Sequence, residues 1–164
     1  MPHIAFIGLG SNLEEPLSQL QRAFTELDKL PGTRLAARSS LYSSAPLGYQ
    51  DQPKFVNAVA KIATKLAPQA LLQALLQIER EHGRERTFRN APRTLDLDVL
   101  LYDDIQMHEH GLTLPHPQMH LRAFVLQPLL EITRDCAIPG IGSAQQALQN
   151  CTDQQLEKLA DAAR

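Results

Sequence analysis

The sequence has few of the features that mark several common protein classes. Its two cysteines, Cys136 and Cys151, form no CxxC pair, and no Cys/His cluster has the spacing of a zinc site. We therefore expect two free thiols, as is usual in a reducing cytoplasm. No apolar run approaches the roughly 20 residues of a membrane helix. Residues 1–5 lack the basic and apolar regions of a signal peptide. These absences predict a cytoplasmic protein that does not enter a membrane.

An excess of charge of one sign is also missing. The formal net charge of -2 gives no general attraction to nucleic acid or to anionic lipid. Hydrophobic residues make up 43% and charged residues 21% of the chain, close to the norm of globular proteins, which argues against disorder. A chain of 164 residues suits one domain and needs no disulfide or structural metal to fold. We expect a single domain over residues 1–164, working as a monomer.

The common nucleotide-binding and hydrolytic motifs are absent as well. There is no G-x-x-x-x-G-K-[ST] segment, which excludes a P-loop enzyme. Residues 8–10, Gly-Leu-Gly, begin a G-x-G-x-x-G pattern that has no third glycine. Neither a G-x-S-x-G elbow nor an H-E-x-x-H zinc motif occurs. Chemistry on phosphates would therefore need a different arrangement of residues.

Hydrophobic periodicity predicts an alternation of strands and helices. Residues 3–9 form an apolar run that ends in glycine and predict a buried strand. Leucines and a phenylalanine at spacings of three and four predict a helix that begins after an Asn12 cap and ends at residues 30–32. We also predict strands at residues 34–43, 55–64 and 95–102, helices at 68–83, 123–132 and, more weakly, 144–163, and loops at 44–54 and 84–92. Two strands in succession favour a partly antiparallel sheet covered by helices, an α+β fold.

A pair of aspartates in the strand at residues 95–102 is the clearest chemical feature. Side chains alternate along a strand, so Asp96 and Asp98 share one face. Leu95, Leu97 and Val99 would point the other way, into a core. Two neighbouring carboxylates repel each other, and a hard divalent cation such as Mg²⁺ offsets that repulsion because it prefers oxygen ligands. The alternative is that both aspartates face only water.

Arginines gather directly before this pair. Five of the eleven arginines lie within fourteen residues, namely Arg80, Arg84, Arg86, Arg89 and Arg93. The planar guanidinium suits phosphate oxygens, so arginines beside paired carboxylates fit a complex of polyphosphate and magnesium. The alternative is a solvated basic loop paired with Glu79, Glu81 and Glu85.

Two further groups could hold a ligand. His116, His120 and Arg122 offer hydrogen-bond donors for phosphate, with a surface turn containing a bonded histidine as the alternative. Phe55 and Asn57 share one face of a strand, where a ring can stack on a flat heterocycle and an amide can pair with its edge. The alternative is a core phenylalanine and an asparagine bonded within the protein.

The segment at residues 89–100, Arg-Asn-Ala-Pro-Arg-Thr-Leu-Asp-Leu-Asp-Val-Leu, resembles the hallmark of the 6-hydroxymethyl-7,8-dihydropterin pyrophosphokinase family. Similar family segments occur in the same order at residues 8–12, 44–48, 55–58, 79–84, 114–116 and 122–124. The resemblance ends near residue 132. It implies a ferredoxin-like α+β core with a mostly antiparallel sheet in a three-layer α/β/α arrangement. It also implies transfer of pyrophosphate from ATP to the hydroxymethyl-dihydropterin, giving AMP and the pterin diphosphate on the route to folate.

The resemblance implies a role for particular residues. Asp96 and Asp98 would hold two Mg²⁺ ions that bridge the triphosphate, and Asp96 would also meet the pterin. Together with Arg84 and Arg93 they would form the catalytic group. The ATP-binding residues would be Glu79, Arg84, Arg93, His116 and Arg122. The pterin would contact Ser44, Leu47, Phe55, Asn57 and Phe124.

The chain departs from the family pattern at three places. Asn90 and Ala91 stand where many members have a Trp-Gly pair that contributes a lid contact. Phe55 replaces a tyrosine of some members and loses its hydroxyl, and Leu76 replaces a glutamine near ATP.

Two rival functions remain open. Another magnesium-dependent transferase with a D-x-D strand would not need the two aromatic rings and the amide of the pterin residues. An RNA-binding module that uses the arginines would leave the paired acids unexplained, because acids repel nucleic-acid phosphates.

Overall fold

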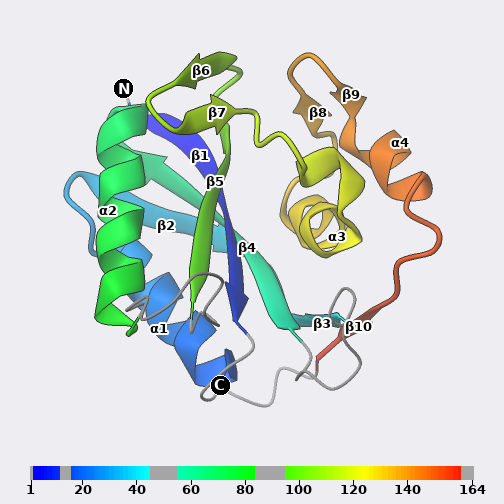
Figure 1. Cartoon of the computed structure of the whole chain (residues 1–164), viewed down its shortest axis with the longest axis horizontal. Helices are drawn as coiled ribbons and strands as arrows, with labels where there is room; N and C mark the ends of the chain where they lie inside the picture. The colour runs from blue at the N-terminus through cyan, green and yellow to red at the C-terminus, as the bar shows by residue number, and fades with distance from the viewer. Residues whose placement is uncertain (1, 12–15, 45–54, 84–94, 160–164) are drawn as a thin grey trace.

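An antiparallel sheet runs through the centre of the molecule, between two layers of helices (Figure 1). The computed structural model describes residues 2–11, 16–44, 55–83 and 95–159. Strands lie in the order β10-β3-β4-β1-β5, and β2 pairs with β4 as well. Their bounds are β1 (His3–Ser11), β2 (Thr33–Arg38), β3 (Tyr42–Ser44), β4 (Phe55–Thr64), β5 (Asp96–Tyr102) and β10 (Leu156–Lys158). The predicted α+β fold with an antiparallel sheet is confirmed.

The helices divide between the two faces of the sheet (Figure 1). α1 (Pro16–Asp28) and α2 (Pro68–Glu81) cover one face, and α3 (Ala123–Ile132) and α4 (Ala144–Gln149) cover the other. This is the expected three-layer arrangement. Smaller elements complete the α3 side and the top edge in the view: β6 (Met107–Glu109), β7 (Leu112–Leu114), the 3₁₀ turn η1 (Met119–Leu121), β8 (Ala137–Ile138) and β9 (Gly142–Ser143).

Each face of the sheet packs on its own apolar core. α1 buries Leu20, Phe24 and Leu27, which recur every three or four residues as an amphipathic helix requires. The opposite core joins Leu126 and Leu129 of α3 to Val59 of β4. Truncating a buried leucine of this kind costs about 2–5 kcal/mol, so these side chains hold both helical layers on the sheet.

The strand predicted at residues 34–43 is in fact two strands. β2 ends at Arg38 and β3 begins at Tyr42, and between them the hydroxyl of Ser39 accepts a hydrogen bond from the Val59 N–H at 2.9 Å. A serine side chain that bonds to the backbone competes with the regular ladder. The break lets β3 continue alongside β4 as a short separate strand.

The long helix predicted at residues 144–163 is wrong. The helix α4 covers only Ala144–Gln149, with its N-terminus capped by the Ser143 hydroxyl, which accepts from the Gln146 N–H at 3.2 Å. Asn150, Thr152 and Asp153 follow it, and such residues favour turns over helix interiors. Leu156–Lys158 then forms β10, which pairs antiparallel with β3.

The predicted start of the first helix falls within residues 12–15 and stays a prediction. The predicted Asn12 cap lies outside the described residues, and α1 starts at Pro16, while β1 extends to Ser11. In the part of the chain that the structure describes, no helix is long and apolar enough to cross a membrane.

Candidate active site

Several predicted site residues meet along one row of the sheet. Asn57 of β4 lies opposite Gly10 of β1, and Gly10 lies opposite Asp96 of β5. Tyr42 of β3 extends the same row beyond Asn57. We call Tyr42, Asn57, Gly10 and Asp96 the Gly10 row. In this row Asn57, predicted to bind the pterin, and Asp96, predicted to bind the metal, lie on either side of Gly10, which has no side chain.

A second glycine repeats this pattern in a neighbouring row. Gly8 lies between Val59 of β4 and Asp98 of β5. A Cβ placed on Gly10 would come 3.1 Å from Asn57 Oδ1, and one on Gly8 would come 3.3 Å from the Leu100 side chain. Gly8 is buried under the Leu100 side chain, whereas Gly10 is partly exposed, so Gly10 is the one of the two that leaves backbone open on the α3 face of the sheet. Glycine within a strand often marks such a close approach of a ligand to the backbone.

The two aspartates lie as their spacing predicts. Leu97 and Val99 are 4% and 3% exposed and belong to the core under α1 and α2. Asp96 is half-buried and Asp98 is exposed, and both point away from that core. The alternation of side chains along β5 is therefore confirmed.

Glu79 contacts the aspartate strand in a way that the sequence did not predict. Its carboxylate is 2% exposed and accepts a hydrogen bond from the Leu97 N–H at 2.7 Å. Among the described strands β5 is at the sheet edge, so this bond satisfies a backbone group that no neighbouring strand reaches. Glu79 thus fixes the segment between Asp96 and Asp98, and its predicted contact with ATP stays a prediction.

His116 approaches Asp98 because β5 contains a bulge. Ile7 of β1 lies opposite Val99 while Phe6 lies opposite Leu101, so Leu100 is an extra residue. Its carbonyl accepts a hydrogen bond from the His116 N–H at 2.9 Å. An extra residue in a ladder re-aims the strand and frees a backbone group for other partners.

His116 is influenced by both Asp98, a predicted metal ligand, and Arg122, a predicted ATP-binding residue. Burial lowers the pKa of His116, the Asp98 carboxylate opposes that shift, and the Arg122 guanidinium adds to it. The ring Nδ1 accepts a hydrogen bond from the Gln118 N–H at 3.0 Å. The neutral ring therefore carries its hydrogen on Nε2, where it can serve as a donor.

Arg122 and Phe124 lie together at the start of α3. The Arg122 Cζ atom is 5.5 Å from the centre of the Phe124 ring, a cation–π contact. Both residues are partly buried. The positive end of the helix dipole adds to the attraction of this region for phosphate. The predicted ATP-binding arginine and the predicted pterin ring are thus direct neighbours.

The Asn57 amide is held by the neighbouring strand. Its Nδ2 donates to the Ser44 hydroxyl at 2.8 Å, and both side chains are buried. Phe55 lies opposite Ser44, is partly buried and begins β4. The two predicted pterin residues of β4 therefore share a face with Ser44 beside them.

Three predicted site residues, Arg84, Arg93 and Leu47, lie outside the described residues, as do the predicted loop at 84–92 and the Asn90–Ala91 departure. The predicted loop at 44–54 also lies outside them except for its first residue, Ser44, which belongs to β3. His120 lies in η1, and its Nδ1 is buried without a hydrogen-bond partner. Within the described ranges no group of three or more His, Cys, Asp or Glu side chains is gathered to hold a metal. Asp96 and Asp98 themselves offer carboxylate oxygens, the type of ligand that Mg²⁺ prefers.

A model of the 7,8-dihydro-6-hydroxymethylpterin-pyrophosphokinase (HPPK) family matches residues 6–134. The chain belongs to this family. It is 46% identical over 155 residues to the 2-amino-4-hydroxy-6-hydroxymethyldihydropteridine pyrophosphokinase of Haemophilus influenzae, covering 94% of this chain and 97% of that one. It is also 46% identical over 157 residues to the enzyme of that name from Pseudomonas aeruginosa, covering 96% and 97%.

Solved structures of HPPK-DHPS chains share the fold. An HPPK-DHPS in complex with substrates aligns with a TM-score of 0.76 and 12% identity, over 93% of this chain and 44% of that one. The wild-type HPPK-DHPS of Plasmodium falciparum with pteroate aligns with a TM-score of 0.72 and 12% identity, over 92% and 42%. The HPPK chain described here spans less than half the length of these solved chains. At such identities the likeness concerns the fold alone.

Proposed function

We propose that this HPPK-family chain transfers pyrophosphate from ATP to 6-hydroxymethyl-7,8-dihydropterin, with Mg²⁺ at Asp96 and Asp98. The products are AMP and the pterin diphosphate, and the step belongs to folate biosynthesis. Family membership over most of the chain supports the reaction. The Gly10 row supports the assignment of the site, because Asn57 and Asp96 lie on either side of Gly10, where an amide could pair with a heterocycle and a carboxylate could bind a metal.

The pterin would lie over Gly10. Asn57 would pair with the edge of the ring, and Phe55 and Phe124 would stack on its faces. Ser44 holds the Asn57 amide in a fixed orientation, which lowers the entropy lost on binding. Ser44 and Leu47 would also meet the pterin through their backbone. The hydroxymethyl group would then point along the row toward Asp96.

The triphosphate would lie between the aspartates and the start of α3. His116 would donate from Nε2 and Arg122 from its guanidinium, and Glu79, Arg84 and Arg93 would complete the ATP site. Asp96 and Asp98 would hold Mg²⁺, which would neutralise charge on the phosphates. Asp96 would accept hydrogen from the hydroxymethyl group as its oxygen bonds to the β-phosphorus. The bond from that phosphorus to the oxygen bridging to the α-phosphorus breaks, and AMP leaves.

The test is to incubate the protein with ATP, Mg²⁺ and the dihydropterin and to identify the nucleotide product. We expect AMP. A magnesium-dependent phosphoryl transferase of another kind would release ADP or ignore the pterin, and an RNA-binding module would release neither.

Asp96→Ala and Asp98→Ala should each reduce turnover by about 10²-fold or more, because the remaining carboxylate cannot orient the triphosphate. Their fold should survive, since removing one of two repelling acids costs the apoprotein little. Asp104→Ala, which changes an exposed aspartate in the turn after β5, is the matched control. Near wild-type turnover of both site variants at saturating Mg²⁺ would contradict the metal assignment.

The single domain, the monomeric state, the cytoplasmic location and the lack of nucleic-acid and membrane partners stay predictions. Gel filtration with light scattering measures the oligomeric state directly. The unpaired thiols of Cys136 and Cys151 accord with a reducing compartment.

A further inference from the structure

The segment after α4 runs from that helix to β10, which lies beside β3 (Figure 1). It lies beyond residue 134, where the match to the family model ends. Cys151, which begins it, is buried, and its end is the strand β10. We call residues 151–159 the strap.

Gln154 of the strap bonds to the backbone on both sides of Arg122. Its Oε1 accepts a hydrogen bond from the Ala123 N–H at 2.8 Å. Its Nε2 donates to the Leu121 carbonyl at 2.8 Å. One side-chain amide thus holds the residue before Arg122 and the residue after it.

These two bonds replace a cap that α3 lacks. The first N–H groups of a helix have no partner within the helix, and a side chain at the N-cap usually accepts from one of them. Arg122 occupies the N-cap of α3 and makes no such bond. Gln154 supplies an acceptor from a distant part of the chain, and this leaves the Arg122 side chain available to the site.

The other end of the strap is paired with β3, the strand that carries Ser44. Leu156 of β10 lies opposite Ser44 of β3, two residues after Gln154. The Leu159 N–H also donates to the Leu41 carbonyl at 2.8 Å. Since Ser44 holds the Asn57 amide, the strap links the start of α3 to the strand that orients Asn57.

We propose that Gln154 is a positioning residue that aims Arg122 at ATP and Phe124 at the pterin. It touches neither substrate and acts through the backbone at residues 121–123. Extended backbone at Arg122, with φ -123° and ψ 110°, sets where both side chains leave the chain. Without Gln154 this turn can rotate while the rest of α3 stays packed on the sheet. The inference rests on the proposed function of the site.

The test compares Gln154→Met with Gln155→Met. Methionine keeps the volume of glutamine and removes both hydrogen bonds, and Gln155 is an exposed neighbour of the same type. Calorimetry measures two dissociation constants, one for MgATP alone and one for the pterin in the presence of a non-hydrolysable ATP analogue. Gln154→Met should raise both about fivefold or more, the size expected when two hydrogen bonds that orient binding groups are lost. Gln155→Met should change neither.

Gln154→Glu separates positioning from stability. Its carboxylate can still accept from the Ala123 N–H but cannot donate to the Leu121 carbonyl, so the cap and the melting temperature should be preserved. Binding of the neutral pterin, which the new charge does not repel, should still be weakened at least threefold. This expectation follows because one of the two positioning bonds is missing.

Two results would overturn the inference. One is a lower melting temperature of Gln154→Met with both dissociation constants unchanged, which would make Gln154 a stabilising residue only. The other is wild-type pterin binding by Gln154→Glu. Failure of the wild-type protein to form AMP would instead count against the proposed function, and the binding measurements would still judge Gln154.

Discussion

The two glycines of β1 matter most at the scale of single residues. A Cβ at Gly10 would lie 3.1 Å from Asn57 Oδ1, closer than nine in ten real Cβ contacts, and the Asn57 amide is itself bonded to Ser44. We expect Gly10→Ala to displace that amide and weaken pterin binding about tenfold, as when a site loses a well-placed hydrogen bond to its ligand. Titration with the pterin and an ATP analogue measures this.

Gly8→Ala is the matched control. Its Cβ would meet the flexible end of Leu100 at 3.3 Å, so the leucine can shift. This variant should lose some stability and keep its affinity for the pterin. Equal pterin affinity of Gly10→Ala and the wild-type protein would mean that the ligand does not lie over the Gly10 row.

The residue pattern predicted which side chains share a face but not what they touch. Period two along β4 and β5 was sufficient to pair Phe55 with Asn57 and Asp96 with Asp98. Gly10 within the strand pattern was a usable sequence signal for exposed backbone, whereas Gly8, two residues earlier, is buried. By contrast, no local pattern links Glu79 to the Leu97 N–H or Gln154 to α3, because those partners are distant in sequence.

At the scale of whole elements, long periodic segments were predictable and short ones were not. α1 and α2 each bury one face that repeats with the period of a helix, and β4 and β5 are apolar strands buried along most of their length on both faces. β3 and β10 have three residues each, too few to show a period, and they exist because they pair with each other and with β4. Tertiary pairing overrode the weak helical pattern at residues 144–163.

One carboxylate ties the end of α3 to the break between β2 and β3. Glu131 accepts hydrogen bonds from the Ser40 N–H at 3.0 Å, the Ser40 hydroxyl at 2.7 Å and the Tyr42 hydroxyl at 2.7 Å. Tyr42 belongs to the Gly10 row, so this contact sets α3 against the strands that carry Ser44 and Asn57.

Glu131→Gln should reduce the free energy of unfolding at neutral pH by roughly 1–2 kcal/mol, since bonds to a charged acceptor are stronger than bonds to an amide. Burial alone would raise the pKa of Glu131, but the hydrogen bonds from Tyr42 and Ser40 prevail and lower it. A lowered pKa stabilises the fold above the ordinary value of 4.5 and the benefit is lost as pH falls through the folded value. The difference between wild type and variant should therefore shrink below about pH 4.5.

Urea unfolding at several pH values measures that difference. Glu157→Gln, an exposed glutamate on β10, is the control and should show no such pH dependence. If the difference in the free energy of unfolding between wild type and Glu131→Gln stayed constant down to pH 3, the charge of the carboxylate would not be the source of the stabilisation.

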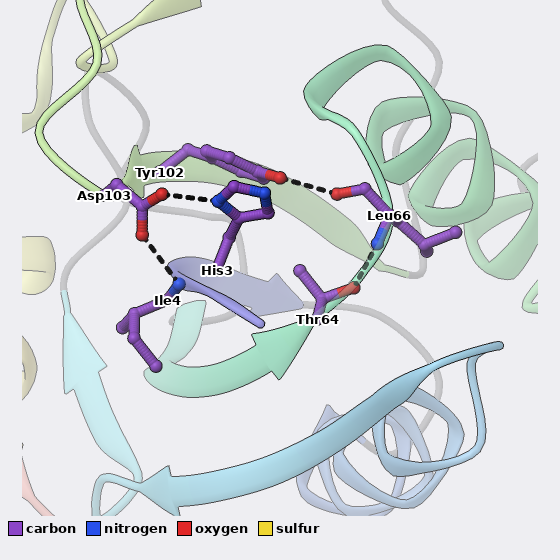
Figure 2. A network of polar contacts seen from close by, with 6 residues as sticks. All are labelled: His3, Ile4, Thr64, Leu66, Tyr102 and Asp103. Carbon is purple, nitrogen blue, oxygen red and sulfur yellow. Dashed lines mark hydrogen bonds and ion pairs between the residues drawn. The ribbon is translucent and has the colours of Figure 1, made fainter. Parts of the chain in front are cut away.

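At the scale of the whole molecule, one end of the sheet carries the candidate site and the other end carries a network of structural hydrogen bonds. A polar network joins the start of β1 to the end of β5 (Figure 2). Asp103 accepts from the Ile4 N–H at 2.8 Å, donates its own N–H to the Ile4 carbonyl at 2.7 Å and lies 2.6 Å from His3 Nδ1. The Tyr102 hydroxyl donates to the Leu66 carbonyl at 2.7 Å, which adds the connection between β4 and α2. These bonds hold β1, β5 and the β4–α2 connection together at the end of the sheet opposite the site.

The distance between the two ends predicts that stability and binding can be changed separately. Gly10 lies seven positions after His3 in β1, about 23 Å along an extended strand. Asp103→Ala removes two side-chain contacts and places alanine at a φ of 48°, which asparagine and aspartate tolerate better than alanine. We expect a loss of about 2 kcal/mol in the free energy of unfolding. Both dissociation constants at 25 °C should stay within twofold of wild type.

Asp103→Asn and Asp104→Ala are the controls for this prediction. Asparagine tolerates the same backbone conformation and can still accept from the Ile4 N–H, so Asp103→Asn should lose less stability than Asp103→Ala. Asp104→Ala, at the exposed neighbour, should be near neutral. Thermal unfolding gives the stabilities and calorimetry the affinities. If Asp103→Ala weakened pterin binding several-fold while remaining folded, the strands β1 and β5 would have to transmit a shift along their length to the Gly10 row. The site would then depend on the whole sheet and not only on the end that carries it.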